Sequence, residues 1–272
     1  MKVLITGAGG FLGSSLVPEM MRAGSKVVAY GRSQSNGVNA CDLSSASAIC
    51  EMLEREKPDV IINCAASVTF AEGALSTMFS VNVMAPIVFA DWCKKNGKYL
   101  VQISSSSVHG IKAELVNEIT AENPDSDYGK SKLMADHAIE ASGCDHAIIR
   151  FGGIFGLNGP DHLGLNQVIR NARKGVVPVI YGQGKALRNY IHVSDASRLI
   201  AFCVSKRMHG VFYGGAELAI SIHQMFNEVC EVYLPGQKPD YKEASEASDQ
   251  IIKLSPVFQG TKTFKEALMA EL

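Results

Sequence analysis

The chain has 272 residues, of which 47% are hydrophobic and 19% are charged, and its formal net charge is -1. A chain of this length and composition can bury a sizeable core, which argues against disorder and allows one large domain or a domain with a smaller appendage. Because the charges nearly cancel, no global excess of positive charge draws the protein onto nucleic acid or anionic lipid. We therefore expect neither nucleic acid nor membrane among its partners.

The cysteines and the N-terminal segment both point to the cytoplasm. Seven cysteines are spread along the chain without C-x-x-C spacing, which predicts reduced thiols and no metal site. The start, MKVLITGAGG, carries an apolar run of four residues that ends in glycines, far short of a secretory signal. No later segment has 18 uninterrupted apolar residues, so we expect a soluble, cytoplasmic protein.

From the first residue to about residue 150, short apolar runs alternate with longer amphipathic stretches. Strands are predicted at 2–5, 26–30, 59–63, 99–104 and 146–151, and helices at 11–23, 44–56, 72–96 and 127–142. The strands are rich in β-branched residues and apolar on both faces, as in a parallel sheet that is covered by helices on both sides. The alternation therefore predicts an α/β fold with a doubly wound parallel sheet, a Rossmann fold.

Beyond residue 151 the pattern loosens. A helix is predicted at 163–174, strands at 177–181 and 189–193, a helix at 195–206, a strand at 210–213, and a helix from 222 that starts with the S-x-x-Q capping box of Ser221 and Gln224. The tail, 236–272, supports no firm prediction. We expect a Rossmann domain over residues 1–155, with strand and helix returns near 183–215, and a smaller, interrupted C-terminal α/β domain over 156–272.

A glycine turn follows the first predicted strand. Gly7, Gly10 and Gly13, in ITGAGGFLG, have the spacing G-x-x-G-x-x-G between a strand and a helix. In such a turn one glycine allows the sharp bend, one lets the backbone approach a pyrophosphate, and one lets the helix lie close on the sheet. The phosphate would meet free N–H groups at a helix N-terminus. The turn therefore predicts a dinucleotide site.

The end of the second strand indicates which dinucleotide is bound. An NAD site normally has an acidic residue there for the adenosine ribose, whereas VVAYGRS offers Gly31 and then Arg32. The guanidinium of Arg32 can pair with a 2′-phosphate, so NADP(H) is favoured over NAD(H); the alternative is a solvated arginine in a loop. Asp42, after the next short strand, would contact the adenine amino group or cap the helix that follows.

Tyr128 and Lys132, in SDYGKSKLMADHA, lie one helical turn apart. Their side chains share a helix face with Cβ atoms about 5–6 Å apart, so the tyrosine is a packed aromatic or a proton donor. A phenol with a pKa of about 10 needs a fall of roughly three units, or about 4 kcal/mol, to exchange protons readily near neutrality. An exposed pair contributes only about 0.2–0.5 kcal/mol. A catalytic Tyr128 therefore requires a partly dry cleft and a positively charged nicotinamide ring nearby.

Four motifs occur in an order that is typical of one family. They are T-G-x-x-G-x-x-G at the first turn, S-S-S-S-V-H-G after the strand at 99–104, Y-G-K-S-K on the next helix, and LRNYIHVSDAS in the second half. Together they resemble the extended short-chain dehydrogenase/reductases, the NAD-dependent epimerase/dehydratase family that acts on nucleotide sugars. The resemblance covers roughly residues 1–235 and is specific for the family rather than for a substrate.

The resemblance implies roles for individual residues. Ser105 matches the catalytic Ser/Thr, with Ser106 close enough to compete for that role or to contact substrate, and Tyr128 and Lys132 match the catalytic Y-x-x-x-K pair. Arg188, with Tyr190 nearby, matches the arginine that holds a nucleotide diphosphate. Asn158 is a sugar contact or a turn residue, and His192 and Asp195 are expected to hold the domains together. The residues expected around the cofactor are Gly7, Gly10, Phe11, Leu12, Gly13, Arg32, Ser33, Asp42, Leu43, Ala65, Ala66, Asn82, Tyr128 and Lys132.

Departures from the family pattern narrow the expected reaction. Family 4,6-dehydratases usually have Asp-Glu directly after the catalytic Ser/Thr, where this chain has Ser106 and Ser107. Family 4-epimerases generally keep NAD bound and often have an Asn where this chain has Gly153. We expect an enzyme that reduces a nucleotide-linked 4-keto-6-deoxysugar with NADPH. The alternatives are a nucleotide-sugar 4-epimerase and, in another class, a non-catalytic NADP(H)-sensing regulator. Helices 72–96 and 127–142 would pair with a second copy in a homodimer, as family members commonly do.

Overall fold

The computed structural model describes residues 1–68 and 75–272, so the first three residues of the predicted helix 72–96 lie outside the described residues. The chain divides into two compact units. Unit 1 comprises residues 1–110, 121–150 and 197–212. Unit 2 comprises residues 111–120, 151–196 and 213–272.

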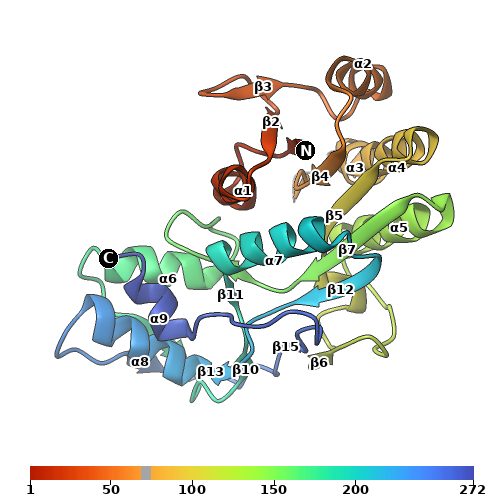
Figure 1. Ribbon diagram of the computed structural model, residues 1–272. Coiled ribbons are helices and arrows are strands. Elements are labelled where there is room, and N and C mark those ends of the chain that lie inside the picture. The colour runs from red at the N-terminus through yellow and green to blue at the C-terminus, as the bar shows by residue number, and fades with distance from the viewer. Residues whose placement is uncertain (69–74) are drawn as a thin grey trace. The chain divides into compact units, whose positions relative to one another are not determined.

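The largest sheet has seven strands in the order β12-β7-β5-β4-β1-β2-β3 (Figure 1). The strands are β1 (Lys2–Thr6), β2 (Lys26–Gly31), β3 (Val38–Ala40), β4 (Val60–Asn63), β5 (Tyr99–Ser105), β7 (Asp145–Phe151) and β12 (Gly210–Gly214). From β3 to β5 all neighbours pair in parallel, and Val3 of β1 lies between Val27 and Val60. The strand order reverses beside β1, which confirms the predicted doubly wound sheet.

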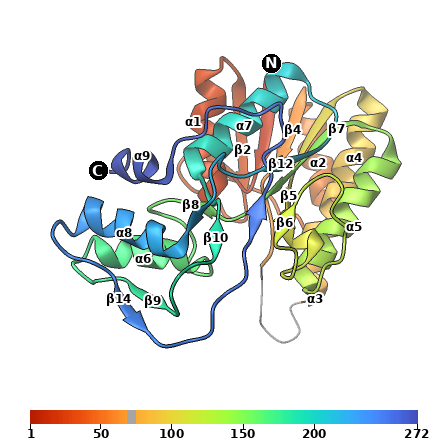
Figure 2. The same ribbon diagram turned by 90° about the horizontal axis from the view of Figure 1, so that it is seen from below.

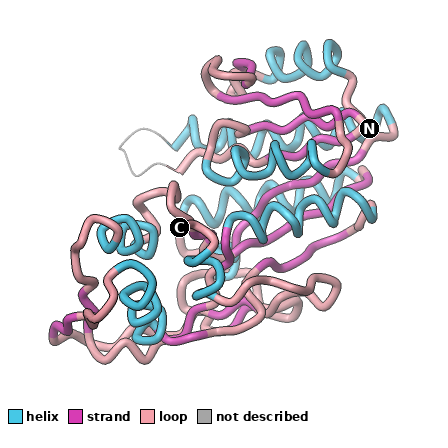
Figure 3. The backbone as a smooth tube through the Cα atoms, turned by 60° about the vertical axis from the view of Figure 1, so that its left-hand side comes forward, coloured by secondary structure: helices cyan, strands magenta, loops and turns pink. Residues whose placement is uncertain are grey.

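Helices cover both faces of this sheet. On one face lies α1 (Phe11–Arg22), beside the part of α7 (Val193–Lys206) where the Ser197 hydroxyl donates to Ser15 at 3.0 Å. On the other face lie α2 (Ala46–Glu56), α4 (Ala85–Asn96) and α5 (Asp127–Ser142) (Figure 2). The strands run between the two helical layers (Figure 3). The predicted Rossmann arrangement is thereby confirmed.

The core of unit 1 lies between the sheet and the second helical layer. Each of four adjacent strands contributes one fully buried aliphatic side chain to it, and three helices cover them. These side chains are Leu4, Ile61, Leu100 and Ile148 from the strands, and Ile49, Leu53, Phe89 and Ile139 from the helices. Burying one such side chain contributes about 1.5–3 kcal/mol, so this layer fixes the strand order that positions the site.

The predicted helix 72–96 is interrupted. In the described residues, α3 (Leu75–Phe79) is followed by a π-helical turn at Ser80–Met84 and then by α4. The stretch Leu75–Asn96 is long and apolar enough to cross a membrane by length and composition alone. Phe89, Ala90 and Cys93 are buried in the core of unit 1, however, and this packing accounts for the apolar character of α4.

Unit 2 is built from two-stranded sheets and three helices in the described residues. The sheets pair β10 (Leu187–Arg188) with β13 (Ile220–Ser221), β11 (Ile191–His192) with β8 (Ile154–Phe155), β14 (Asp240–Lys242) with β9 (Val179–Tyr181), and β15 (Ile251–Ile252) with β6 (Leu115–Val116). The helices are α6 (Gly164–Ala172), α8 (Ile222–Tyr233) and α9 (Phe264–Met269). Ile169, Val229 and Leu268 of these helices are fully buried in one apolar cluster. The predicted strand 189–193 is real but shorter, at two residues.

The capping box predicted at Ser221 is only half formed. The Ser221 hydroxyl accepts from Gln224 N at 3.0 Å, but the Gln224 side chain donates to Glu228 instead of returning to the cap. The complete box lies in the tail, where Thr263 caps Glu266 N and the Glu266 carboxylate accepts from Thr263 N at 2.9 Å. This box starts α9, an element that the weak periodicity of the tail did not predict.

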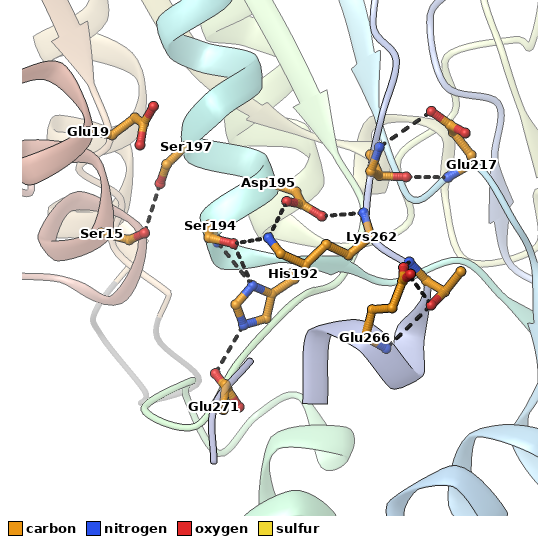
Figure 4. Close-up of polar contacts among 12 residues, drawn as sticks. Ser15, Glu19, His192, Ser194, Asp195, Ser197, Glu217, Lys262, Glu266 and Glu271 are labelled. Carbon is orange, nitrogen blue, oxygen red and sulfur yellow. Dashed lines mark hydrogen bonds and ion pairs between the residues drawn. The ribbon is translucent and has the colours of Figure 1, made fainter. Parts of the chain in front are cut away.

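Polar contacts fasten the C-terminal segment within unit 2 (Figure 4). Lys262 Nζ donates to Asp195 and to Ser194, each at 2.9 Å, and its backbone N–H donates to the other Asp195 oxygen at 2.8 Å. His192 Nε2 lies 3.0 Å from Glu271 Oε1. These contacts give His192 and Asp195 a structural role inside unit 2.

Candidate active site

The glycine turn lies where the strand order reverses. Gly7 has φ +66°, and a Cβ there would lie 2.7 Å from Ala65 N in the loop after β4. A Cβ on Gly13 would lie 2.2 Å from the Gly7 carbonyl, so only glycine lets α1 start this close to the turn. Gly10 caps α1 without a side-chain hydrogen bond, which leaves the first N–H groups of Phe11 and Leu12 available to an anion. The turn therefore fits the pyrophosphate of a dinucleotide.

A buried row of polar side chains crosses the carboxyl ends of three strands beside this turn. Thr6 donates to Asn63 Oδ1 at 2.5 Å, and Asn63 Nδ2 donates to Gln102 Oε1 at 2.8 Å. Asn63 Oδ1 also accepts from Ala65 N at 3.3 Å. The row ties the loop that carries Ala65 and Ala66 to the sheet. Sequence reasoning missed it, although Thr6 and Asn63 are polar residues that directly follow the buried apolar runs of β1 and β4.

Arg32 follows directly after β2 and is exposed, as is Ser33. Among the described residues no carboxylate pairs with the Arg32 guanidinium, so it is available to a phosphate. Asp42 accepts from the backbone N–H and the hydroxyl of Ser44, at 2.9 and 2.6 Å. The helix that follows is capped by Ser45, so of the two alternatives for Asp42 the one in which it caps this helix is wrong. Leu43 packs against the core of unit 1.

Asn82 lies in the π-helical turn, is 1% exposed and links three segments. Its side chain accepts from Ser67 N at 2.7 Å and donates to Ser67 O at 2.9 Å. It also donates to Ser131 at 3.1 Å, and the Ser131 hydroxyl donates to the Tyr128 carbonyl at 2.7 Å. Single π-turns inside helices often mark functional sites. Here the π-helical turn orients the Asn82 side chain, and this side chain connects the loop after β4 to the first turn of α5.

Ser105 ends β5 and caps a short 3-10 helix, Ser106–His109. Its oxygen accepts two hydrogen bonds from Ser107, from the backbone N–H at 3.2 Å and from the hydroxyl at 2.9 Å. Because both acceptor positions are used, the Ser105 hydroxyl hydrogen is left to donate. Sequence reasoning considered Ser106 as the competitor of Ser105, but the orienting residue is Ser107.

The first turn of α5 lies directly against Ser105–Ser107, which we call the serine turn. Ser126 caps α5 by accepting from Gly129 N at 3.1 Å. A Cβ on Gly129 would lie 2.5 Å from the Ser107 carbonyl, so glycine at this position permits the contact. Tyr128 precedes Gly129, and the structure thereby brings Tyr128 to the turn that carries Ser105.

Lys132 is 2% exposed, and its Nζ donates to the Ile103 carbonyl of β5 at 2.6 Å. The same Nζ lies 5.9 Å from the centre of the Tyr128 ring. Burial lowers the pKa of Lys132 to about 8, and the Asp136 carboxylate opposes that fall. Burial raises the pKa of Tyr128 to about 12, and Asp136 adds to this rise. Without a cofactor Tyr128 is therefore a protonated phenol, and the expected fall of its pKa requires positive charge beyond Lys132.

Three expected substrate residues belong to unit 2. Arg188 is 7% exposed and its Nη1 donates to the carbonyls of Leu187 and Ser248, both at 2.7 Å. Tyr190 packs on Gly153, where a Cβ would lie 2.2 Å from the ring. This contact gives a physical reason for the glycine at 153. Asn158 is exposed in a turn that the hydrogen bond from Gly159 N to Gly156 O closes at 2.9 Å.

Comparison with known proteins agrees with the site. The model of the NAD dependent epimerase/dehydratase family matches residues 3–212. The dTDP-glucose 4,6-dehydratase of Salmonella typhimurium is 26% identical over 257 residues, which cover 78% of this chain and 71% of that protein. The dTDP-4-dehydrorhamnose reductase of Streptomyces griseus is 30% identical over 162 residues, which cover 58% of this chain and 51% of that protein.

A solved structure extends the similarity along the whole chain. MoeE5 in complex with UDP-glucose and NAD superposes with a TM-score of 0.83 at 26% identity, covering 100% of this chain and 97% of that one. The matched family segment contains the glycine turn, the serine turn and the Tyr128–Lys132 pair. The chain is therefore an enzyme of the NAD-dependent epimerase/dehydratase family, of the extended short-chain dehydrogenase/reductase type.

Proposed function

We propose that the protein reduces the keto group of a nucleotide-linked 4-keto-6-deoxysugar and uses NADPH as its cofactor. One observation carries this proposal: the first turn of α5, which carries Tyr128, lies against the turn of Ser105–Ser107, where the Ser105 hydroxyl is oriented to donate. Reduction of a ketone needs a proton donor at its oxygen, and a phenol is protonated and can donate at neutral pH.

The chain supplies three groups for this reaction. The Ser105 hydroxyl donates a hydrogen bond to the keto oxygen, and Tyr128 donates the proton that makes it a hydroxyl. The Lys132 ammonium holds the ribose of the nicotinamide nucleoside and stabilises the tyrosinate that remains. When bound, the dinucleotide supplies the hydride and carries a positive charge once oxidised.

A preference for NADP(H) over NAD(H) is part of the proposal. It is supported by Gly31 and Arg32 at the end of β2, where an NAD site normally has a carboxylate. The Arg32 guanidinium is exposed and matches the geometry of a 2′-phosphate. Solved neighbours such as MoeE5 bind NAD, so this preference would distinguish the present chain from them.

The serine turn supports reduction over dehydration. Elimination of water needs a second acid and base next to the substrate, and Ser106 and Ser107 offer only hydroxyls there. A 4-epimerase is disfavoured by the pairing of Gly153 with Tyr190, since the ring occupies the space of any side chain at 153. Among the unit 2 residues, Arg188 is proposed to contact the diphosphate through its Nε and Nη2.

The proposal also includes a homodimer in the cytoplasm. Exposed apolar side chains on the helices at 75–96 and 127–142, Leu75, Met84 and Met134, are each at least half exposed and would be covered by a second copy. Light scattering of the purified protein tests this part independently of activity.

The reaction is tested by mixing the purified protein with NADPH and a set of nucleotide-linked 4-keto-6-deoxysugars. The expected result is loss of the reduced-nicotinamide absorbance with at least one sugar, and a slower loss with NADH. No loss with any sugar would refute the proposed reaction. Interconversion of UDP-glucose and UDP-galactose without added cofactor would establish an epimerase instead.

A further inference from the structure

The face of α5 that carries Tyr128 and Lys132 continues for one more turn to Asp136. The three residues follow each other at i, i+4 and i+8, so their side chains share one face of the helix. Asp136 is fully buried. Its Oδ2 accepts from Ser104 Oγ at 2.8 Å and from Arg150 Nε at 2.9 Å. Its Oδ1 is buried and has no hydrogen-bond partner among the described residues.

An unpartnered carboxylate oxygen in the interior is costly, by about 1–3 kcal/mol or more. Both hydrogen bonds at Oδ2 are donated to the carboxylate, and Oδ1 meets no acceptor that a carboxylic proton could reach in the described residues. Burial raises the pKa of Asp136, whereas the guanidinium of Arg150 at 2.9 Å lowers it. The hydrogen-bond pattern is that of an ionised carboxylate. Because burying such a charge is costly, we expect it to have a role.

Lys132 lies one helical turn from Asp136 and carries the opposite charge. The ammonium group is almost fully buried, and one carbonyl, that of Ile103, accepts from it. The charged and titratable groups that face it are few in the described residues. From α5 they are Tyr128 and Asp136, from the loop after β4 the buried thiol of Cys64, and from β7 Arg150 by way of Asp136; β5 offers only a carbonyl and serine hydroxyls. Within residues 1–68 and 75–272, Asp136 is thus the single carboxylate found to interact with the lysine.

We propose that Asp136 is a positioning residue of the site, whose carboxylate, held in place by Arg150, keeps the buried ammonium of Lys132 protonated. The charges alternate from the site outward, from Lys132 to Asp136 to Arg150 and then to Glu122, whose carboxylate lies 2.6 Å from Arg150 Nη2. This inference rests on the proposed contact of Lys132 with the nicotinamide nucleoside, but not on which sugar is reduced.

The test uses the full-length protein and the binding of NADPH, followed by its fluorescence over a series of pH values. In the wild type, NADPH binding is expected to weaken at high pH as Lys132 loses its proton. The plot of affinity against pH then has an alkaline limb. Asp136→Asn is expected to move that limb to lower pH, because the negative charge of Asp136 raises the pKa of Lys132. Binding at the acidic end of the series is expected to stay close to that of the wild type, because Lys132 is charged there in both proteins.

Two variants complete the design. Ser104→Ala removes a hydrogen bond to Asp136 but keeps the charge, so its limb is expected at the wild-type position. The double variant Asp136→Asn with Arg150→Gln removes both members of the buried ion pair, which proteins often tolerate, and its limb is expected to shift as in the single variant. Circular dichroism confirms folding at each pH.

A merely structural role for Asp136 predicts a different result. Binding by the variants would then fall by the same factor at every pH, with the limb unmoved, and this outcome would overturn the proposal. A double variant that does not fold would also count against it, because the pair would then serve the fold. Failure to reduce any keto sugar, combined with a shifted limb, would refute the proposed reaction and leave the role of Asp136 standing.

Discussion

At the scale of single residues, the site depends on how one hydroxyl is aimed. Ser105 accepts both hydrogen bonds from Ser107, so the direction of its own O–H follows from its neighbour. The serine run in the sequence indicated a polar site at the end of a strand. It could not indicate which serine orients which, because that depends on the 3-10 turn that begins at Ser106.

Ser107→Ala removes one of these two hydrogen bonds and lets the Ser105 hydroxyl rotate. A hydrogen bond of about 1–1.5 kcal/mol corresponds to a fall of roughly tenfold in kcat/KM. Steady-state kinetics with NADPH and the keto sugar measures it. Ser107→Thr is the matched control, because it keeps a hydroxyl that can donate to Ser105. An equal loss in both variants would contradict the assigned role of Ser107.

The proposed preference for NADP(H) depends on Arg32. Arg32→Gln is expected to weaken NADPH binding by roughly 10- to 100-fold, as for the loss of a charge-assisted contact of about 1.5–3 kcal/mol, and to leave NADH binding unchanged. Fluorescence titration with both dinucleotides measures this change, and NADH serves as the internal control. Equal weakening of both, or no change in either, would show that Arg32 does not read a 2′-phosphate.

At the scale of elements, most of the fold of unit 1 could be predicted. The helix at 127–142 matches α5, and the five predicted strands match β1, β2, β4, β5 and β7 within a residue at each end. The reason is that β1, β4, β5 and β7 are apolar runs buried on both faces, and the partly buried β2 begins with two consecutive valines after Lys26. The π-helical turn at Ser80–Met84 could not be predicted in this way, since one extra residue in a turn leaves the periodicity of the surrounding helix almost intact.

The tail shows a signal that was present and missed. Thr263 and Glu266 have the capping-box spacing and form the complete box, whereas Ser221 and Gln224 have it and form only half. The glutamine at N3 finds Glu228 one turn later, so the spacing alone does not decide which partner a side chain takes. Local contacts of this kind compete, and the half-formed and the complete box have the same spacing in the sequence.

The contact between α5 and the serine turn makes a sharp prediction for Gly129. Alanine in a helix is normally about 1 kcal/mol better than glycine, so Gly129→Ala would stabilise α5 if its side chain had room. Because the new Cβ would lie 2.5 Å from the Ser107 carbonyl, we expect a less stable protein with kcat/KM lower by about tenfold to a hundredfold.

Thermal unfolding and kinetics measure both effects. Gly164→Ala is the matched control, since it also lies near a helix start and its Cβ would meet nothing within 4 Å. A Gly129→Ala protein that is more stable and fully active would show that α5 does not depend on this close approach.

At the scale of the whole molecule, the two units interleave along the chain. The sequence predicted returns to the first domain near 183–215, but it did not predict a segment of unit 2 before residue 151. Residues 111–120 belong to unit 2, and within it Leu115–Val116 pairs with Ile251–Ile252. A pair of two-residue strands so far apart in sequence has no periodicity of its own. Long-range pairing of this kind is set by the folded topology rather than by local pattern.

The buried lysine makes the stability of the whole molecule depend on pH. Its pKa in the folded state is about 8, below the ordinary value of 10.5, so the unfolded chain binds more protons between these values. Stability from this group therefore rises with pH across that window, by about 3 kcal/mol at most. Relative to Lys132→Met, the free energy of unfolding of the wild type is expected to increase as pH rises from about 8 to about 10.5.

Chemical denaturation of both proteins across this range measures that difference, and the ionisable groups that do not interact with Lys132 cancel in it. A difference in the free energy of unfolding that stays constant with pH, or that shrinks, would mean that Lys132 is not desolvated in the folded protein.

The central claim, that Tyr128 protonates a sugar ketone as hydride arrives, is tested most directly by isotope transfer. The protein is incubated with NADPH that carries deuterium at the transferred position and with a nucleotide-linked 4-keto-6-deoxysugar, and the sugar is analysed by mass spectrometry and NMR. We expect one deuterium bound to carbon 4 of a reduced sugar in the wild type, and almost none with Tyr128→Phe that still binds NADPH. An unlabelled sugar in the wild type, or equal labelling by the Tyr128→Phe variant, would contradict the account.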